Sequence, residues 1–236
     1  MRGEERSKDE LRPLRIKVDF LPNPLSSVLI ELGKTMVLCT VSLEEKVPSF
    51  LKGSGTGWIT AEYAFLPAAT LERSTREVLT RKGRSLEIQR LIGRVLRAVT
   101  DLPKLGERTL WVDCDVLNAD GGTRTASVTG SVIALKLAFI KLINRGIIAE
   151  DPLMEYAAGV SVGKIGGDFY LDLDYEEDQL AEVDANFFLT ESGKIVEIQA
   201  GAEKGLFTWE DLSTMKDLAW KGISSLINKQ REVLGE

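Results

Sequence analysis

Segment 111–130 places a strand, a flexible turn and the start of a helix directly after one another. Apolar and polar side chains alternate over residues 111–117, and this alternation predicts a strand with Val112, Cys114 and Val116 facing a core. We expect the rest of the chain to be organised around this segment.

A turn and a helix follow the predicted strand. Asn118, Asp120 and the pair Gly121–Gly122 tolerate the backbone angles that a sharp turn needs. Apolar residues then recur at steps of three and four, which predicts a helix. These residues are Val128, Val132, Leu135, Phe139 and Leu142. The helix should end at residues 144–146, because glycine is a common stop signal.

A strand, a glycine turn and a helix start together form a geometry that can bind phosphate. The unpaired N–H groups and the positive dipole end of a first helical turn attract an anion, and glycines let the anion approach the backbone closely. Arg124 and Thr125 lie at this helix start, where the dipole disfavours a cation unless something negative binds there. The alternative is a simple turn with a solvated Arg124 side chain, and local physics alone does not separate the two interpretations.

The length and charge of the chain limit its class. A chain of 236 residues can form one sizeable α/β domain or two small ones with a shared core. The net charge is −6, no apolar run looks long enough to span a bilayer, and the charged N-terminus shows no signal-peptide pattern. Cys39 and Cys114 fall in predicted strands, where core residues are expected rather than a disulfide or a metal pair. We therefore expect a protein of the reducing cytoplasm with no membrane partner.

The sequence contains no histidine. This absence excludes Ser-His and Cys-His nucleophilic machinery and any histidine-ligated metal. Any chemistry must therefore use carboxylates, arginine, lysine or a hard metal ion.

Strand-rich sections followed by helices occur twice, before and after about Glu150. The predicted strands and hairpins are 27–42 with a turn at Gly33-Lys34, Trp58 to Phe65, 158–174 with a turn at Gly166-Gly167, and 186–200 with a turn at 191–194. Thr208 and Asp211 form a capping-box pattern that starts a last helix, and the acidic segment 175–184 is expected to be a loop. This pattern predicts an α+β fold with two similar β/α lobes in a single domain, 1–236, rather than a doubly wound sheet.

Two further segments carry weaker signals. Gly53, Gly55 and Gly57 superficially resemble a nucleotide loop, but the terminal Lys-Ser/Thr of a Walker motif is missing, so we interpret this segment as a turn. The charged arm from Arg2 to Arg12 is expected to be mobile or to lie on a partner.

The stretch between Arg73 and Arg97 is strongly basic. Its cations are Arg73, Arg76, Arg81, Lys82, Arg84, Arg90, Arg94 and Arg97, and they are opposed by Glu77 and Glu87. Arginine concentrated in this way in an acidic protein can form a binding surface for a polyanion. An amphipathic helix is predicted from Leu86, and its arginine-bearing face fits a solvated surface as well as RNA contact. Arg84 is expected just before the first helical turn, where it could contact the same anion as Arg124.

Asp178 and Asp184 flank a short predicted loop. Carboxylates that converge from the two ends of a loop could hold a hard divalent cation such as Mg²⁺ through oxygen ligands and waters. One carboxylate could also serve as a general acid. An acidic loop that is only solvated is the alternative interpretation.

Long segments of the chain resemble ribonuclease PH, a family of phosphate-dependent exoribonucleases that trim transfer RNA 3′ ends. The segments are ELRPLRIKVDF, TMVLCTVSLEEKVPSFLKGSGTGWITAEYAFLP, GRSLEIQRLIGRVLRAVTDL, LGERTLWVDCDVLNADGGTRTASVTG, YLDLDYEEDQLAEVDAN and EIQAGAE. The resemblance runs from about Arg2 to the last helix. It implies a fold of paired β and α layers, related to the second domain of ribosomal protein S5, and a homo-hexameric ring built as a trimer of dimers.

The resemblance also implies roles for individual residues. It assigns phosphate binding to Arg84, Gly122, Thr123 and Arg124, with Thr125 and Ser127 nearby. It assigns Mg²⁺ binding and the general-acid role to Asp178 and Asp184. Contacts with the RNA backbone are expected from Arg73, Arg76, Arg90, Arg94 and Arg97.

The implied reaction is reversible phosphorolysis in transfer and ribosomal RNA processing. Inorganic phosphate attacks the last 3′ phosphodiester of a transfer RNA precursor, which releases a nucleoside diphosphate and an RNA one nucleotide shorter. Phosphate is already anionic near neutral pH and needs positioning more than deprotonation, which agrees with the absence of histidine.

The sequence departs from the family pattern at a few positions. Ala68 and Leu71 stand where the family usually has an Arg and a His, and the loop before Arg84 looks shortened. VDANFFLT and EIQAGAEKG also differ from the usual motifs. None of these differences touches the phosphate or carboxylate residues.

Two other classes of function are alternatives to a catalytic exoribonuclease. A non-catalytic ring subunit would only channel RNA, and the presence of Arg124, Asp178 and Asp184 argues against it. A small-molecule phosphotransferase would need a nucleotide-binding loop, and none in the sequence is convincing.

Overall fold

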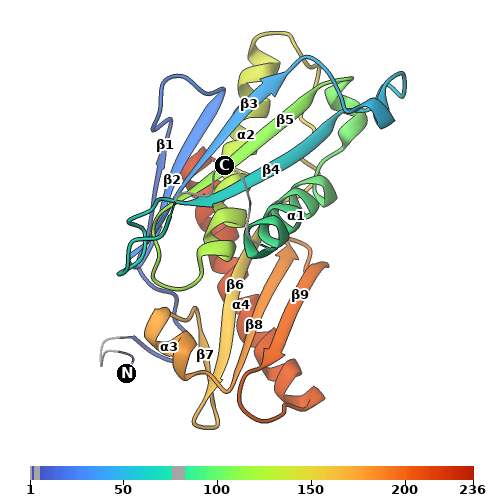
Figure 1. Cartoon of the computed structure of the whole chain (residues 1–236). Coiled ribbons are helices and arrows are strands. Elements are labelled where there is room, and N and C mark those ends of the chain that lie inside the picture. The colour runs from blue at the N-terminus through green and yellow to red at the C-terminus, as the bar shows by residue number, and fades with distance from the viewer. Residues whose placement is uncertain (1, 3–5, 76–82) are drawn as a thin grey trace.

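The structure is a computed structural model that describes residues 2, 6–75 and 83–236. These residues form two sheets, which lie one above the other in Figure 1, with helices between and beside them. In chain order the elements are β1 (Leu14–Val18), β2 (Ser26–Leu32), β3 (Thr35–Glu44), the 3-10 turn Ser49–Leu51, β4 (Trp58–Phe65), α1 (Gly83–Ala98), the 3-10 turn Leu102–Leu105, β5 (Thr109–Asn118), α2 (Thr123–Asn144), β6 (Ala157–Ile165), β7 (Asp168–Leu171), α3 (Tyr175–Leu180), β8 (Val183–Thr190), β9 (Ile195–Ala202) and α4 (Trp209–Leu234).

The first sheet has five strands in the order β1-β2-β3-β5-β4. β2 and β3 form the predicted hairpin, and Gly33 at its turn has a φ of +59°. β4 and β5 are the parallel pair of this sheet, and α1 lies between them in the chain. Parallel strands end at the same edge of a sheet, so the turn that leaves β5 lies beside the end of β4.

Helix α2 lies between the two sheets and contacts β2, β3 and β6. All five apolar residues predicted to face the core, from Val128 to Leu142, are buried. We expected no segment long enough to span a bilayer, yet α2 has the length and apolar composition for it, and 72% of its most apolar window is buried inside the protein. A helix that is apolar all round and enclosed in this way is a core helix.

The second sheet has four strands in the order β7-β6-β8-β9. The first seven residues of β6 are all buried, as expected for a strand with helices packed against it, and β6 contacts both α2 and α4. α4 begins at the predicted capping box, in which the Thr208 side chain accepts a hydrogen bond from the backbone N–H of Asp211 and the Asp211 carboxylate accepts one from that of Thr208.

One continuous hydrophobic core joins the two sheets, with Val112 on one side and Phe187 on the other. Cys39 and Cys114 belong to this core as free thiols, as predicted, and face each other across β3 and β5 with their sulfur atoms 3.9 Å apart.

Three local predictions were wrong. α1 begins at Gly83 rather than Leu86, so Arg84 lies within the first helical turn. The acidic segment is not a loop throughout, because Asp174 caps a short helix, α3, and that helix carries Asp178. The N-terminal arm was expected to be mobile or to lie on a partner, but Arg2, Arg6 and Arg12 bond to the protein's own second half.

Candidate active site

A cavity of about 470 Å³ opens where the edge of the first sheet meets the second sheet. Its walls include Arg84, Gly122, Thr123 and Arg124 from the first half of the chain and Asp178 and Asp184 from the second half. The structure therefore brings together four of the predicted phosphate-binding residues and both predicted carboxylates.

The glycine turn at the end of β5 is shaped by two positive φ angles, +75° at Gly121 and +63° at Gly122. A Cβ atom on Gly121 would lie 2.5 Å from the carbonyl oxygen of Leu173, so only glycine fits this contact between the two halves. The hydroxyl of Thr35 holds the turn from the other side, because it donates to the carbonyl of Gly121 at 2.6 Å. The turn thus presents the start of α2 to the cavity in a fixed orientation.

The start of α2 is suited to an anion. No side chain caps its N-terminus, and its first turn contains no acidic residue. The N–H groups of a first turn lack intrahelical acceptors and carry a partial positive charge. Arg124 adds a guanidinium in this turn, and Arg84 adds another from the first turn of α1. One wall of the cavity is therefore strongly electropositive.

Arg124 and Thr123 are held by side chains that the sequence alone did not identify. Arg124 Nη1 donates to Gln199 Oε1 on β9 at 2.7 Å. The Tyr63 hydroxyl donates to Thr123 Oγ1 at 2.8 Å, so the Thr123 proton is free to point elsewhere. Burial raises the pKa of Tyr63 to about 12, which keeps its phenol protonated at any working pH. Alternation along β4 predicts that Tyr63 faces inward, but it cannot name the partner.

Thr125 and Ser127 do not line the cavity. Both side chains are fully buried and bond within α2, Thr125 Oγ1 to the carbonyl of Gly122 at 2.8 Å and Ser127 Oγ to that of Thr123 at 2.8 Å. Their hydroxyls stabilise the helix start, and their assignment to phosphate binding stays a prediction.

Asp178 and Asp184 line the same cavity from α3 and from the second position of β8. Burial raises the pKa of Asp178, and Arg124 and Arg84 oppose this shift. Burial also raises the pKa of Asp184, and the charge of Asp178 adds to the effect. Two carboxylates that repel each other in one cavity favour a proton or a cation between them.

Two polar side chains, Ser161 and Asn186, line the cavity, and a third, Gln199, lies on the neighbouring strand. Ser161 and Asn186 line the cavity and lie directly opposite each other on β6 and β8, and Asn186 is paired in turn with Gln199 on β9. Asn186 is two residues after Asp184, so both point to the same face of the sheet. The alternation of β8 was the available signal, but the sequence did not show which strands would lie beside it.

The arginines predicted to contact RNA have different environments. Arg73 and Arg90 are exposed, Arg94 pairs with Glu197 on β9, and Arg97 donates to the carbonyl of Ile59 at 2.8 Å with its guanidinium 4.4 Å from the Trp58 ring centroid. Arg94 and Arg97 thus help to pack α1, while Arg76 falls outside the described residues. RNA contact by all five stays a prediction.

Two other sequence segments are placed by the structure. The glycine loop at Gly53 and Gly55 lies outside the cavity, and both residues have positive φ angles typical of turns. Leu71, one of the departures from the family pattern, is 99% exposed and stands at the cavity wall.

Comparison with known proteins assigns this chain to a family. Sequence models of the 3′ exoribonuclease family match residues 10–141 as its domain 1 and residues 155–222 as its domain 2. The ribonuclease PH of Bacillus velezensis is 55% identical over 240 residues, covering 100% of this chain and 98% of the relative, and that of Bacillus subtilis is 54% identical over the same length and shares. The crystal structure of rice (Oryza sativa) Rrp46 has the same fold, with a TM-score of 0.80 at 18% identity over 99% of this chain and 100% of that one.

The two matched domains coincide with the two sheets, and the cavity lies where they meet. The fold is thus the one that the sequence resemblance predicted. Together with more than half identity along the whole chain, these matches show that the chain belongs to the ribonuclease PH family of 3′ exoribonucleases.

Proposed function

We propose that this cavity performs phosphorolysis of RNA 3′ ends. As a member of its family, the chain is a phosphate-dependent 3′–5′ exoribonuclease of transfer RNA processing. The observation that carries the proposal is that one cavity is lined both by a helix start with two arginines and by a pair of carboxylates. Such a site can hold an attacking anion on one side and a scissile phosphodiester on the other.

Arg84, Arg124 and the start of α2 bind the attacking phosphate. An oxygen of this phosphate forms a bond to the phosphorus of the last phosphodiester, and the bond from that phosphorus to the 3′ oxygen of the preceding nucleotide breaks. The products are a nucleoside diphosphate and an RNA with a new 3′ hydroxyl. The two guanidiniums reduce the repulsion between the two anions and fix the direction of attack.

The carboxylates fit a magnesium ion. Mg²⁺ prefers hard oxygen ligands and is usually held by one or two carboxylates together with water and substrate phosphates. Among the described residues, no third carboxylate or thiol joins Asp178 and Asp184 as a metal-binding group. Asp178 and Asp184 would hold the ion, and the chemistry it would supply there is neutralisation of negative charge near the scissile phosphate.

Asp184 and Asp178 also suit proton transfer. A carboxyl group with a raised pKa is a better proton donor near neutral pH than an ordinary aspartate. The leaving 3′ oxygen needs one proton, which one of these carboxyl groups or the attacking hydrogen phosphate supplies.

Transfer RNA precursors are the proposed substrates, and a homo-hexamer built as a trimer of dimers is the proposed assembly. Leu206 and Trp209, three residues apart in the chain, are 93% and 81% exposed, and exposed patches of large apolar side chains are typical of partner surfaces. Light scattering after size exclusion should give about six times the chain mass of 26.0 kDa, whereas a monomer would contradict the assembly.

A product assay tests the proposed reaction. The protein and Mg²⁺ are incubated with a labelled transfer RNA that carries a short 3′ extension, with and without phosphate, and the mononucleotides are resolved. Nucleoside diphosphates that form only with phosphate support phosphorolysis. Monophosphates without phosphate would mean hydrolysis, and RNA binding without any product would mean a channelling subunit.

A further inference from the structure

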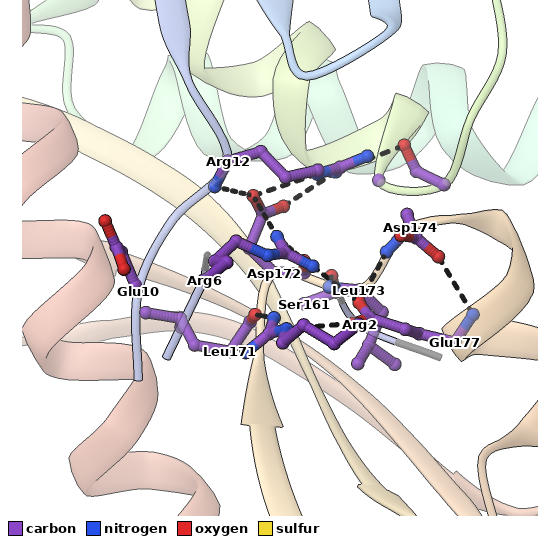
Figure 2. Close-up of polar contacts among 12 residues, drawn as sticks. Arg2, Arg6, Glu10, Arg12, Ser161, Leu171, Asp172, Leu173, Asp174 and Glu177 are labelled. Carbon is purple, nitrogen blue, oxygen red and sulfur yellow. Dashed lines mark hydrogen bonds and ion pairs between the residues drawn. The ribbon is translucent and has the colours of Figure 1, made fainter. Parts of the chain in front are cut away.

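The described residues of the N-terminal arm bond to both halves of the chain that form the cavity. Figure 2 shows Arg12 above Asp172, with Arg6 and Arg2 below it and beside Glu177. Arg12 and Asp172 lie 160 residues apart in the chain, and both are buried, at 6% and 0% exposure. Neither residue lines the cavity.

Arg12 holds the glycine turn and the second half of the chain at the same time. Its Nε and Nη2 atoms donate to the two oxygens of Asp172, at 3.0 and 2.7 Å, in a two-pronged pairing. Its Nη1 atom donates to the carbonyl of Asp120 at the start of the turn. A Cβ atom on Gly122 would lie 2.9 Å from Arg12 Nη2, so the guanidinium packs directly beneath the residue that precedes α2.

Asp172 is itself fixed from the second sheet. It has a φ of +54°, in the left-handed region, and its backbone N–H donates to the carbonyl of Ser161 at 2.7 Å. Burial would lower the pKa of Arg12, but the charge and hydrogen bond of Asp172, together with the charges of Asp120 and Asp174, outweigh burial, and the pKa is raised. The Arg12 guanidinium therefore stays charged at any working pH.

Arg2 and Arg6 hold the helix that carries Asp178. Glu177 is buried at 3% exposure, and its carboxylate accepts from Arg2 Nε at 2.8 Å and from Arg6 Nη2 at 2.7 Å. The same carboxylate accepts from the backbone N–H of Asp174 at 3.0 Å and so completes the capping box of α3. Since α3 has six residues, its cap fixes much of its geometry.

From these contacts we propose that the N-terminal arm positions the active site: Arg12 sets the phosphate-binding turn, and Arg2 and Arg6 set the helix of Asp178 through Glu177. Arg2, Arg6, Arg12, Asp172 and Glu177 are positioning residues in this proposal, because none of them lines the cavity. The inference rests on the proposed function, since it assigns the turn to phosphate binding and Asp178 to the reaction.

The two ends of the arm should have separable kinetic effects. Arg12→Lys keeps the positive charge beside Asp172, but one ammonium cannot reproduce the planar fork that bridges Asp172 and the turn. The expected result is a KM for phosphate raised by roughly tenfold with kcat within about twofold of wild type, because saturating phosphate compensates for a loosened turn.

Releasing Glu177 should act on the chemical step instead. The double variant Arg2→Gln and Arg6→Gln leaves the capping box without its two guanidiniums. We expect kcat to fall by roughly tenfold or more with little change in the KM for phosphate, because Asp178 loses its fixed position. Lys8→Gln is the matched control: Lys8 lies on the same arm and pairs with Asp168, away from the cavity, and this variant should keep both constants.

Amide hydrogen exchange provides a readout that does not depend on the reaction. Exchange should accelerate in the peptide that spans α3 in the double variant and in the peptide that spans Asp120 to Gly122 in Arg12→Lys, but in neither for Lys8→Gln. Unchanged exchange at these two places would overturn the proposal, even if the wild-type protein released no nucleoside diphosphate and the proposed function failed. The proposal would also be overturned if the variants had a lower melting temperature but the same KM, kcat and local exchange as wild type.

Discussion

At the scale of single residues, the cavity combines charges that its own surroundings disfavour. Arg124 lies in a first helical turn, where the dipole opposes a cation, and Asp184 lies beside a second carboxylate. Both arrangements cost free energy in the empty protein. Both become favourable when an anion binds at one wall and a cation or proton binds at the other.

Arg124→Ala should abolish phosphate-dependent turnover, with a loss of at least about a hundredfold, and leave RNA binding largely intact. In the proposed mechanism, this change removes a guanidinium from the attacking phosphate but not from the RNA backbone. Arg145→Ala is a suitable control, because Arg145 is exposed at the other end of the same helix. The measurements are nucleoside diphosphate release and RNA affinity by anisotropy, and an equal loss of both would contradict the assigned role.

Asp184→Asn should abolish turnover at saturating phosphate and yet make the protein more stable at neutral pH. The raised pKa of Asp184 means that the folded protein holds this proton more tightly than the unfolded chain does. The folded state therefore loses stability as pH rises through the raised pKa, and asparagine avoids this loss.

The difference in melting temperature between the two proteins should shrink as the pH falls toward the ordinary aspartate pKa of about 3.9. Thermal unfolding in metal-free buffer across this range checks the sign. A variant less stable than wild type at pH 7, or one with nearly full activity, would argue against the assigned environment of Asp184.

Tyr63→Phe should raise the KM for phosphate by a few-fold and lower the free energy of unfolding by about 1 kcal/mol. The tyrosine is 2% exposed, and its hydroxyl orients Thr123 at the start of α2. Steady-state kinetics and denaturant unfolding measure the two effects. Kinetics equal to wild type would mean that Thr123 needs no orientation by its neighbour.

At the scale of elements, the sequence predicted what depends on local pattern. The alternation along β5 and the three-four spacing along α2 identified both elements, and Thr208 with Asp211 located the start of α4. α3 was missed because six residues are too few for a periodic pattern, and its capping box is visible only once Asp174 is known to precede a turn of helix.

The site was predictable in part for the same reason. Gly122, Arg124 and the two aspartates stand out locally by charge or by backbone freedom. Gln199, Tyr63 and Arg12 do not, because their roles come from partners 75, 60 and 160 residues away. These contacts depend on the order of the strands in the sheet and on their register. The periodicity within one strand reveals neither the order nor the register.

Gly121→Ala should be much more damaging than Gly166→Ala. Both glycines have positive φ angles, which cost an alanine about 1–2 kcal/mol. The new Cβ at Gly166 meets nothing within 4 Å, whereas at Gly121 it would lie 2.5 Å from a backbone oxygen of the other half. We expect the free energy of unfolding to fall by about 1 kcal/mol or more beyond this cost in Gly121→Ala, because the new Cβ atom overpacks the contact. We also expect Gly121→Ala to lose phosphate-dependent activity. Equal losses of stability in denaturant unfolding would show that the turn can move away from Leu173.

At the scale of the whole molecule, ligand binding should stabilise the fold, because the cavity exists only when both sheets are in place. Phosphate at about one hundred times its Kd should add about 2.7 kcal/mol to the free energy of unfolding. The effect should disappear in Arg124→Ala and persist in Arg145→Ala. Thermal scans with phosphate and with a chloride control at equal ionic strength measure it, and equal stabilisation by both salts would argue against a specific site.

The bonds of Arg12 also have a consequence for the order of synthesis. A ribosome makes the chain from its N-terminus, so Arg12 and the glycine turn emerge well before Asp172, Asp178 and Asp184 exist. The Gln230 side chain, near the end of the chain, is buried and bonds to the backbone of both α2 and β6. A nascent chain thus has no complete cavity while most of it is still being translated. Until Asp178 and Asp184 have been synthesised and have folded, an enzyme that degrades RNA has no complete site with which to attack the transfer RNA and messenger RNA that produce it.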